Sequence, residues 1–264
     1  ELGKRQDQAA AKALIIWNGL NKAGESAYLE RKQVGGYGVR YDDEGVLYIP
    51  VLDVKGKLWG VQQIFKAVDP ETGRDINFLP YGLKKKGCFT RIGPAPMSNE
   101  PIALAEGYAT GASIYEATGF TTFVCFDGGN LAPVAEALRG VFPVNPMIIC
   151  ADDDYKTTNA KGDLWNVGRE KAKKVVEAFN GYMIYPSFVD QEKRGTDFND
   201  LHCIEGVDQV RRQVKGVLSA CDVIDWRSQF ITTLTGKVTN DIANVELVLE
   251  NDPAWRGVLG YSDF

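Results

Sequence analysis

Three separated groups of acidic residues have the types and positions of a metal site. They are Glu106 in IALAEGYATG, Asp152 to Asp154 in MIICADDD, and Asp197 and Asp200 in TDFNDLH. Each group lies where an apolar run stops or a polar turn begins. Two like charges about 4 Å apart repel by roughly 4 kcal/mol at an effective dielectric near 20. If the groups meet in the fold, a bound divalent cation is the simplest way to relieve that repulsion.

The side-chain types also indicate which metal. The set is all oxygen, which suits Mg²⁺ or Mn²⁺ better than zinc. In an extended segment Asp152 and Asp154 point to the same side, so they form a natural pair of ligands. The chain has one histidine, His202, and no CxxC pair among its five cysteines, so a zinc finger or ribbon is not expected.

Each acidic group also has a purely structural interpretation. Glu106 could be an acid that a helix dipole favours at an amino terminus, and the three consecutive aspartates could be a solvated turn. The TDFND segment could be a helix cap. The combination of all three groups is much more specific for a metal site than any one of them.

The elements that must position these acids form an α/β series that begins near Pro101. Predicted strands are IALAE, TTFVCFD, MIICADDD and GYMIYP, and helices are expected over YATGASIYEATG, LAPVAEALRGV, 166–179 and 207–217. Strands alternating with helices predict a mostly parallel sheet with helices on both faces. Sites in such sheets collect at the carboxyl ends of the strands, which is where the acids lie.

A different pattern precedes this series. Residues 6–20 have helical spacing, and VLYIPVLDV and LWGVQQIFKAV flank the turn Lys55-Gly56-Lys57 as expected of a β-hairpin. The following DPETGRD is expected to be a loop. We therefore predict a mixed α/β amino-terminal module over 1–97, an α/β domain over 98–217, and a linker or the start of another segment over 218–264, with a helix at 242–249.

Basic and aromatic residues of the first module are candidates for binding phosphates and bases. The densest basic cluster is Lys84, Lys85 and Lys86, followed by Arg91, with Arg31, Lys32 and Arg40 as weaker candidates. The alternative is a solvated charged loop. The aromatic residues Tyr37, Tyr41, Tyr48 and Trp59 could stack on bases, although strand packing is the more common role of such residues.

Composition limits the classes of protein. With 264 residues and 44% hydrophobic residues the chain can bury a core, and its net charge of -5 argues against a wholly basic nucleic-acid binder. The scattered cysteines suggest reduced thiols and a cytoplasmic location. No apolar stretch approaches the roughly 18 residues of a membrane span. The GxxxxGK[ST] and GxSxG motifs are absent, which disfavours P-loop ATP hydrolysis and a serine hydrolase. The start at Glu1 suggests a fragment of a longer protein.

AEGYATG, ADDD and TDFND, in this order on a β/α series, resemble the Toprim domain shared by bacterial-type primases, type IA and II topoisomerases and some nucleases. The resemblance implies that Glu106 is an acid/base or metal-linked residue and that Asp152 and Asp154 are the metal pair. It also implies that Asp197, with Asp200 nearby, is the later metal-associated acid. Thr110 and Asn199 depart from the pattern, because primases often carry an aspartate at those places.

The upstream segments VLDVKGKLWGVQQI and NFLPYG resemble the RNA-polymerase-like module of bacterial primases, most closely those of phages and conjugative plasmids. The likeness covers roughly residues 25–215. It implies a primase core that makes short primers on single-stranded DNA from nucleotide triphosphates with one or two Mg²⁺ or Mn²⁺ ions. The final residues resemble the opening of a helicase part, which implies a replicative helicase fused downstream in a bacterial cytoplasm. Two alternatives are a metal-dependent Toprim nuclease and a non-catalytic adaptor that holds single-stranded DNA for a helicase.

Overall fold

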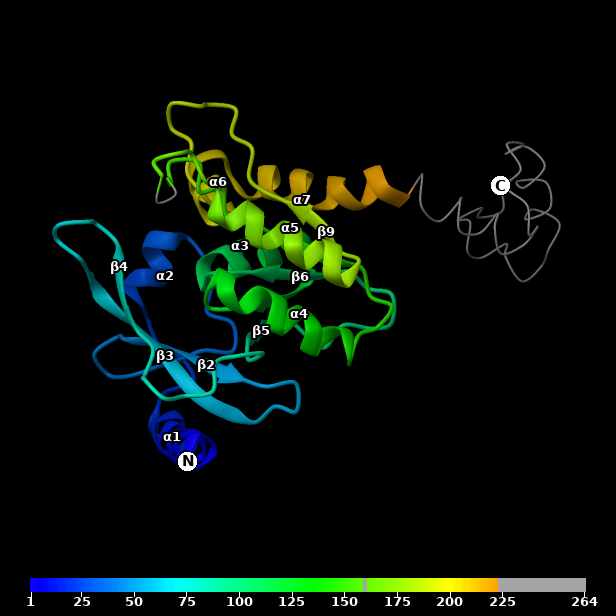
Figure 1. The fold of residues 1–264 in the computed structure, drawn as a ribbon. Helices are drawn as coiled ribbons and strands as arrows, with labels where there is room; N and C mark the ends of the chain where they lie inside the picture. Colours follow the sequence, from blue (N-terminus) through cyan, green and yellow to red (C-terminus); the bar gives the residue numbers. More distant parts are fainter. Residues whose placement is uncertain (159–160, 223–264) are drawn as a thin grey trace, which may run out of the picture. The chain divides into compact units, whose positions relative to one another are not determined.

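The structure, a computed structural model, describes residues 1–158 and 161–222 (Figure 1). The chain divides into two compact units, Glu1–Val217 and Leu218–Phe264. The helix predicted at 242–249 and most of the segment predicted to lead to a helicase lie outside the described residues. Within the described part, no helix combines the length and apolarity that crossing a bilayer requires. The predicted boundary between 97 and 98 stays a prediction.

The first sheet is antiparallel and carries the predicted hairpin. Its strands are β1 (Arg40–Tyr41), β2 (Leu47–Leu52), β3 (Leu58–Val68) and β4 (Asp75–Phe78), in the order β1-β2-β3-β4. The turn between β2 and β3 forms because the Asp53 carboxylate accepts the Lys55 and Lys57 amides at 2.9 and 3.0 Å, while Gly56 takes φ +78°. Helix α1 (Leu2–Gly19) packs against β3, and α2 (Ala27–Lys32) follows it along the chain.

The second sheet is mostly parallel, as predicted. Its strands are β5 (Thr90–Ile92), β6 (Ile102–Ala105), β7 (Thr121–Val124), β8 (Met147–Cys150) and β9 (Tyr182–Ile184), in the order β5-β7-β6-β8-β9. Only β5 runs antiparallel to its neighbour. The helices are α3 (Tyr108–Thr118), the short 3₁₀ helix η1 (Gly128–Asn130), α4 (Leu131–Arg139), α5 (Val167–Phe179), α6 (Phe198–Glu205) and α7 (Val207–Asp222).

Helices cover both faces of this sheet, which confirms the predicted fold class. Helices α4 and α5 bury apolar side chains such as Leu138 and Val175 against Leu104 and Ile149 of the strands. On the other face, α3 packs its small residues against Val124 and Ile92. That second core also contains Leu47, Ile49 and Ile64 of the antiparallel sheet, so it belongs to both sheets.

Six elements were not predicted from the sequence, namely β1, β4, β5, α2, η1 and α6. Strands β1, β4 and β5 are two to four residues long, and β4 is largely exposed, so neither length nor alternation marks them. Helix α6 begins directly after Asp197, in a segment that we interpreted as a ligand-bearing turn. Its eight residues end at Gly206, whose φ of +90° separates α6 from α7.

Candidate metal and nucleotide site

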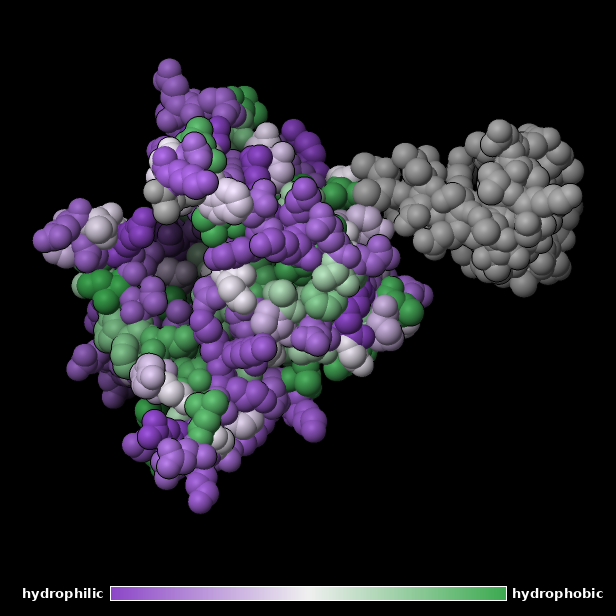
Figure 2. All heavy atoms as spheres, in the orientation of Figure 1, coloured by the Kyte–Doolittle hydropathy of each residue, from purple (hydrophilic) through white to green (hydrophobic). Residues whose placement is uncertain are grey.

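The carboxyl ends of three adjacent parallel strands bring acidic residues to one edge of the second sheet. Asp127 follows β7, Glu106 follows β6 and Asp152 follows β8, and the sheet places these strands side by side. Asp197 joins them from the first turn of α6. Glu106, Asp152 and Asp197 line a cleft of about 560 Å³. Figure 2 shows the surface hollowed between the β3–β4 hairpin and the α5 and α6 side.

Asp152 is the acid with the strongest unmet need for a cation. Its Oδ1 atom is buried and has no hydrogen-bond partner within the described part of the chain. Burial, followed by repulsion from Asp197 and Glu106, raises the pKa of Asp152 to about 9. A buried carboxylate oxygen without a donor, surrounded by other acids, fits a hard divalent cation.

Glu106 and Asp197 have partners that orient them. Burial raises the pKa of Glu106, and Lys171 and the Gly128 amide partly oppose that rise. Burial and the neighbouring Asp200 raise the pKa of Asp197. The Asp197 carboxylate accepts the Thr110 hydroxyl at 3.1 Å and the Asp200 amide at 2.8 Å. Asp197 therefore caps α6, as the structural interpretation expected, and also faces the cleft.

The other two predicted ligands, Asp154 and Asp200, accept hydrogen bonds from backbone amides. Asp154 Oδ2 accepts the Gly168 amide at 3.0 Å, and Asp200 Oδ2 accepts the Thr196 amide at 2.8 Å. Over residues 1–158 and 161–222, no three acidic, histidine or cysteine side chains converge closely enough to hold an ion as they stand. The ligand set thus stays a prediction, with Asp152 at its centre.

The two positions that depart from the primase pattern have structural roles. Thr110 holds Asp197 through its hydroxyl. Asn199 is buried and donates to the Lys32 carbonyl at 2.7 Å and to Ser113 Oγ at 3.1 Å, so its amide ties α6 to α2 and α3. Neither contact directs these side chains to a metal.

Asp153, the middle acid of the triplet, anchors the loop and is not a ligand. It is 4% exposed and forms ion pairs with Arg169 at 3.0 Å and Arg194 at 3.1 Å. Asn166 Nδ2 donates to it at 2.5 Å. The guanidinium groups of Arg169 and Arg194 in turn stack on tyrosine rings at 3.4 Å. Sequence reasoning missed this network, because its two arginines are distant from Asp153 along the chain.

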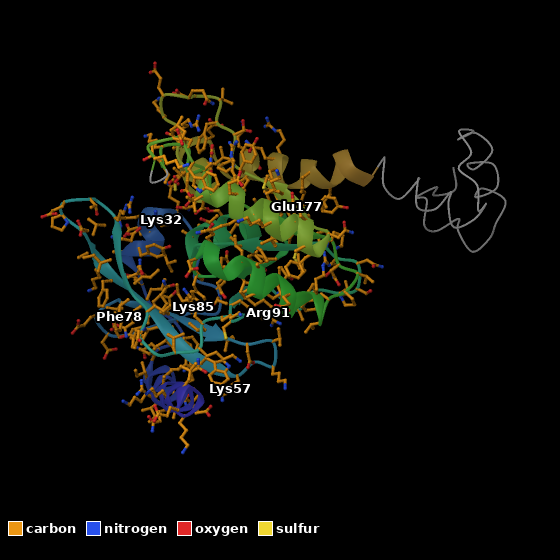
Figure 3. The ribbon with its side chains drawn as sticks, viewed as in Figure 1. Lys32, Lys57, Phe78, Lys85, Arg91 and Glu177 are labelled. Atoms are coloured by element: carbon orange, nitrogen blue, oxygen red, sulfur yellow. The ribbon has the colours of Figure 1, made fainter. Side chains whose placement is uncertain are left out.

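The predicted phosphate-binding residues do not line the acidic cleft. Lys84 lies 4.6 Å from the Trp59 ring, and Lys85 forms an ion pair with Asp127. Arg91 lines a separate apolar cavity of about 340 Å³. Arg40 donates to the Trp17 carbonyl and stacks on the Trp17 ring, so it fixes α1 to β1. In Figure 3, Lys32 lies at α2, whereas Lys85 and Arg91 lie away from it.

The cations that do line the cleft are Lys32 and Arg74. Lys32 opposes the rise in the Asp197 pKa, so its charge acts at the acidic site. Lys32 was one of the weaker candidates for phosphate binding, and Arg74 was not predicted to have a role. Arg74 lies in the DPETGRD turn, where no sequence pattern connects it with acids of the second sheet.

Most of the predicted stacking aromatics are packing residues. Tyr41 is buried, Tyr37 packs edge-on against Tyr115 with ring centroids 5.0 Å apart, and Tyr48 donates to Asp42. Trp59 differs, because Lys57 lies 3.7 Å from its ring centroid and Lys84 lies on the ring as well. Trp59 with its two lysines is the one predicted stacking residue that keeps a surface suited to nucleic acid.

Comparison with known proteins shows which families and proteins this chain is similar to. Residues 101–208 match the family model described as Toprim domain. Two Escherichia coli proteins named DNA primase TraC are each 38% identical, over 169 and 158 residues, covering 62% and 59% of this chain. The chain spans only 11% and 14% of those relatives.

Among solved structures, the DnaG primase catalytic domain bound to single-stranded DNA aligns with a TM-score of 0.51 over 99% of this chain and 98% of that chain, at 13% identity. At that identity the alignment supports the fold alone. The predicted fold and the predicted resemblance to Toprim-containing, bacterial-type primases are both confirmed.

Proposed function

We propose, from the Toprim domain that residues 101–208 form, that this chain is the catalytic core of a DNA primase. The observation that carries the proposal is the meeting of Glu106, Asp152 and Asp197 in one cleft, with a buried Asp152 oxygen to which no group of the described residues donates. The 38% identity to two proteins named DNA primase TraC supports the same activity. The reaction is nucleotidyl transfer that builds short primers on single-stranded DNA from nucleotide triphosphates.

The residues of the cleft suit this chemistry. Asp152, Asp154 and Asp197, with Asp200 beside them, would hold one or two Mg²⁺ or Mn²⁺ ions, and Glu106 would orient a ligand or accept a proton. Such an ion, when bound, supplies the charge that activates a 3′-hydroxyl and stabilises departing pyrophosphate. Lys32 and Arg74 lie where they would attract the triphosphate into an otherwise acidic cleft.

The remaining partners follow from the same proposal. Template DNA would contact Lys84–Lys86, Arg91 and Trp59, which lie outside the acidic cleft and combine positive charge with a half-buried ring. A helicase fused downstream and a bacterial cytoplasmic location rest on the likeness of the last residues to phage primase-helicases. Both are hypotheses about the longer protein.

Primer synthesis on single-stranded DNA tests the function directly. We expect labelled nucleotides to be incorporated with Mn²⁺ or Mg²⁺, and incorporation to fall to background with EDTA and return when the metal is restored. Gel analysis of the products is the measurement. DNA cleavage without nucleotides would instead indicate a nuclease. DNA binding that is indifferent to metal, without incorporation, would indicate an adaptor.

Arg74→Gln tests the assignment of the cleft cations. Because Arg74 offers a charge to the substrate without lying at the reacting atoms, we expect the KM for nucleotide to rise about tenfold, equivalent to about 1.4 kcal/mol, with kcat within about twofold. Lys193→Gln is a matched control, because Lys193 is 75% exposed and pairs with Asp190 at the surface. An unchanged KM in Arg74→Gln would remove Arg74 from the substrate site.

A further inference from the structure

We infer that the turn Asp127–Asn130 positions the Glu106 carboxylate and couples it to the segment Lys84–Cys88, here called the lysine loop. Nothing in the sequence pattern singled out this turn, which reads DGGN and follows β7. The inference rests on the proposed function, because it assigns a positioning role to residues around a proposed catalytic acid. Two contacts of the turn and its rigidity carry the inference.

The first contact is between the turn and Glu106. Gly128 lies against the Glu106 carboxylate, and its amide opposes the rise that burial causes in the Glu106 pKa. A Cβ atom at Gly128 would lie 2.6 and 2.8 Å from the two carboxylate oxygens and 2.8 Å from Lys171 Cδ. Gly128 is not among the residues with positive φ, so its backbone would accept an alanine. The glycine is therefore required by the closeness of Glu106 and Lys171 and not by the turn itself.

The second contact is between the turn and the lysine loop. Lys85 forms an ion pair with Asp127, and the Gly87 amide donates to Asn130 Oδ1 at 2.9 Å. Asn130 Nδ2 donates to the Cys88 carbonyl at 2.9 Å, and it also reaches the Cys125 carbonyl at the end of β7. The lysine loop thus docks on Asp127 and Asn130, the two ends of the turn whose Gly128 lies against Glu106.

The third observation is the rigidity of the turn. Asn130 is 2% exposed and Asp127 caps η1 by accepting the Asn130 amide at 3.1 Å. Phe126, directly before the turn, has φ +71°, a conformation that costs free energy for a bulky residue and persists only where surrounding contacts enforce it. A rigid turn transmits a displacement at one end to the other.

The consequence is a link between substrate occupancy and the catalytic acid. A phosphate that binds Lys85 competes with Asp127 for the ammonium group, because both are anions that pair with the same cation. Release of Asp127 changes the contacts that hold the turn, and with them the Gly128 amide that orients Glu106. Phosphate bound at the lysine loop therefore changes the orientation of Glu106, although the lysine loop does not line the acidic cleft.

Gly128→Ala tests the positioning step. The added methyl group meets the end of a flexible side chain, so Glu106 is expected to move while the fold stays intact. We expect kcat for primer synthesis to fall about 30-fold, with the nucleotide KM within about threefold and Tm within about 2 °C. Gly216→Ala on α7 is the control, because a Cβ there meets nothing within 4 Å. An unchanged kcat in Gly128→Ala, or a loss explained by a lower Tm, overturns the assignment.

The coupling step is tested without relying on primase activity. In ¹H–¹⁵N spectra we expect the Gly87 amide resonance to shift in Glu106→Gln and in Gly128→Ala, and to stay in place in Gly216→Ala. Gly87 lies in the lysine loop, and its amide is bonded to Asn130 of the turn, so the turn is the path by which we expect either substitution to reach it. A Gly87 resonance that is indifferent to both substitutions refutes the coupling. If the wild-type chain makes no primers, the proposed function fails while this measurement still decides the coupling.

Discussion

Replacing Asp152 with asparagine is expected to abolish primer synthesis and, at the same time, to stabilise the folded protein. Asp152 lies buried among Glu106, Asp154, Asp197 and Asp200, all of which raise its pKa. Loss of its charge removes a metal ligand, so we expect kcat to fall by about a thousandfold, equivalent to about 4 kcal/mol of transition-state stabilisation.

The stability effect has the opposite sign because, without metal, folding raises the pKa of Asp152 to about 9, so at neutral pH the buried carboxyl must take up a proton that it does not hold in the unfolded chain. Asparagine keeps the shape and ends the repulsion, so unfolding without metal should cost about 1–3 kcal/mol more than in the wild type. Calorimetry in EDTA measures this. Asp208→Asn, at a side chain that is 76% exposed, should change neither quantity appreciably. A less stable Asp152→Asn with full activity would contradict both the burial argument and the metal site.

The second large effect is expected at the neighbouring Asp153, where the same substitution should lower the stability of the fold instead of raising it. Asp153→Asn leaves Arg169 and Arg194 without their shared carboxylate and weakens the loop that presents Asp152 and Asp154. Removing one partner of a buried ion-pair network destabilises strongly, so we expect a loss of about 3 kcal/mol and a Tm about 6–12 °C lower.

Asp190→Asn is the matched comparison for this substitution. Asp190 is 45% exposed and pairs with Lys193 at 3.4 Å, so its loss should cost less than about 1 kcal/mol. Urea unfolding of the wild type, Asp153→Asn and Asp190→Asn measures their free energies of unfolding and ranks their stabilities. Equal stability of Asp153→Asn and Asp190→Asn would show that the arginines find other partners and that the network is not what holds the acidic loop.

The alternation of strands and helices after Pro101 predicted the second sheet well, because long periodic segments and apolar runs specify their own type. The rule that parallel strands end at a common edge then predicted that Glu106 and Asp152 meet, and the cleft brings them together with Asp197. What could not be predicted was which neighbours each side chain takes. Asp153, Lys32 and Arg74 depend on pairing between segments that only the folded chain brings together.

The lysine cluster illustrates the same limit. Three consecutive lysines predict local positive charge, but they do not predict which residues the lysine side chains face in the fold. Lys85 turns to Asp127 because β5 carries the lysine loop to the end of β7, and β5 is a three-residue strand with no recognisable pattern. The role that we assign to Asp127 was missed for the same reason, because it requires knowing which strand follows which in the sheet.

The core shared between the two sheets has a thermodynamic consequence. Leu47 and Ile64 of the antiparallel sheet pack with Ile92, Tyr108 and Val124, and β2 is bridged to the β5 segment by Leu52 and Phe89. Neither sheet can lose its partner without exposing this apolar surface. Residues 1–217 should therefore melt in a single calorimetric transition. The acidic edge of the second sheet would then unfold and refold together with the amino-terminal module.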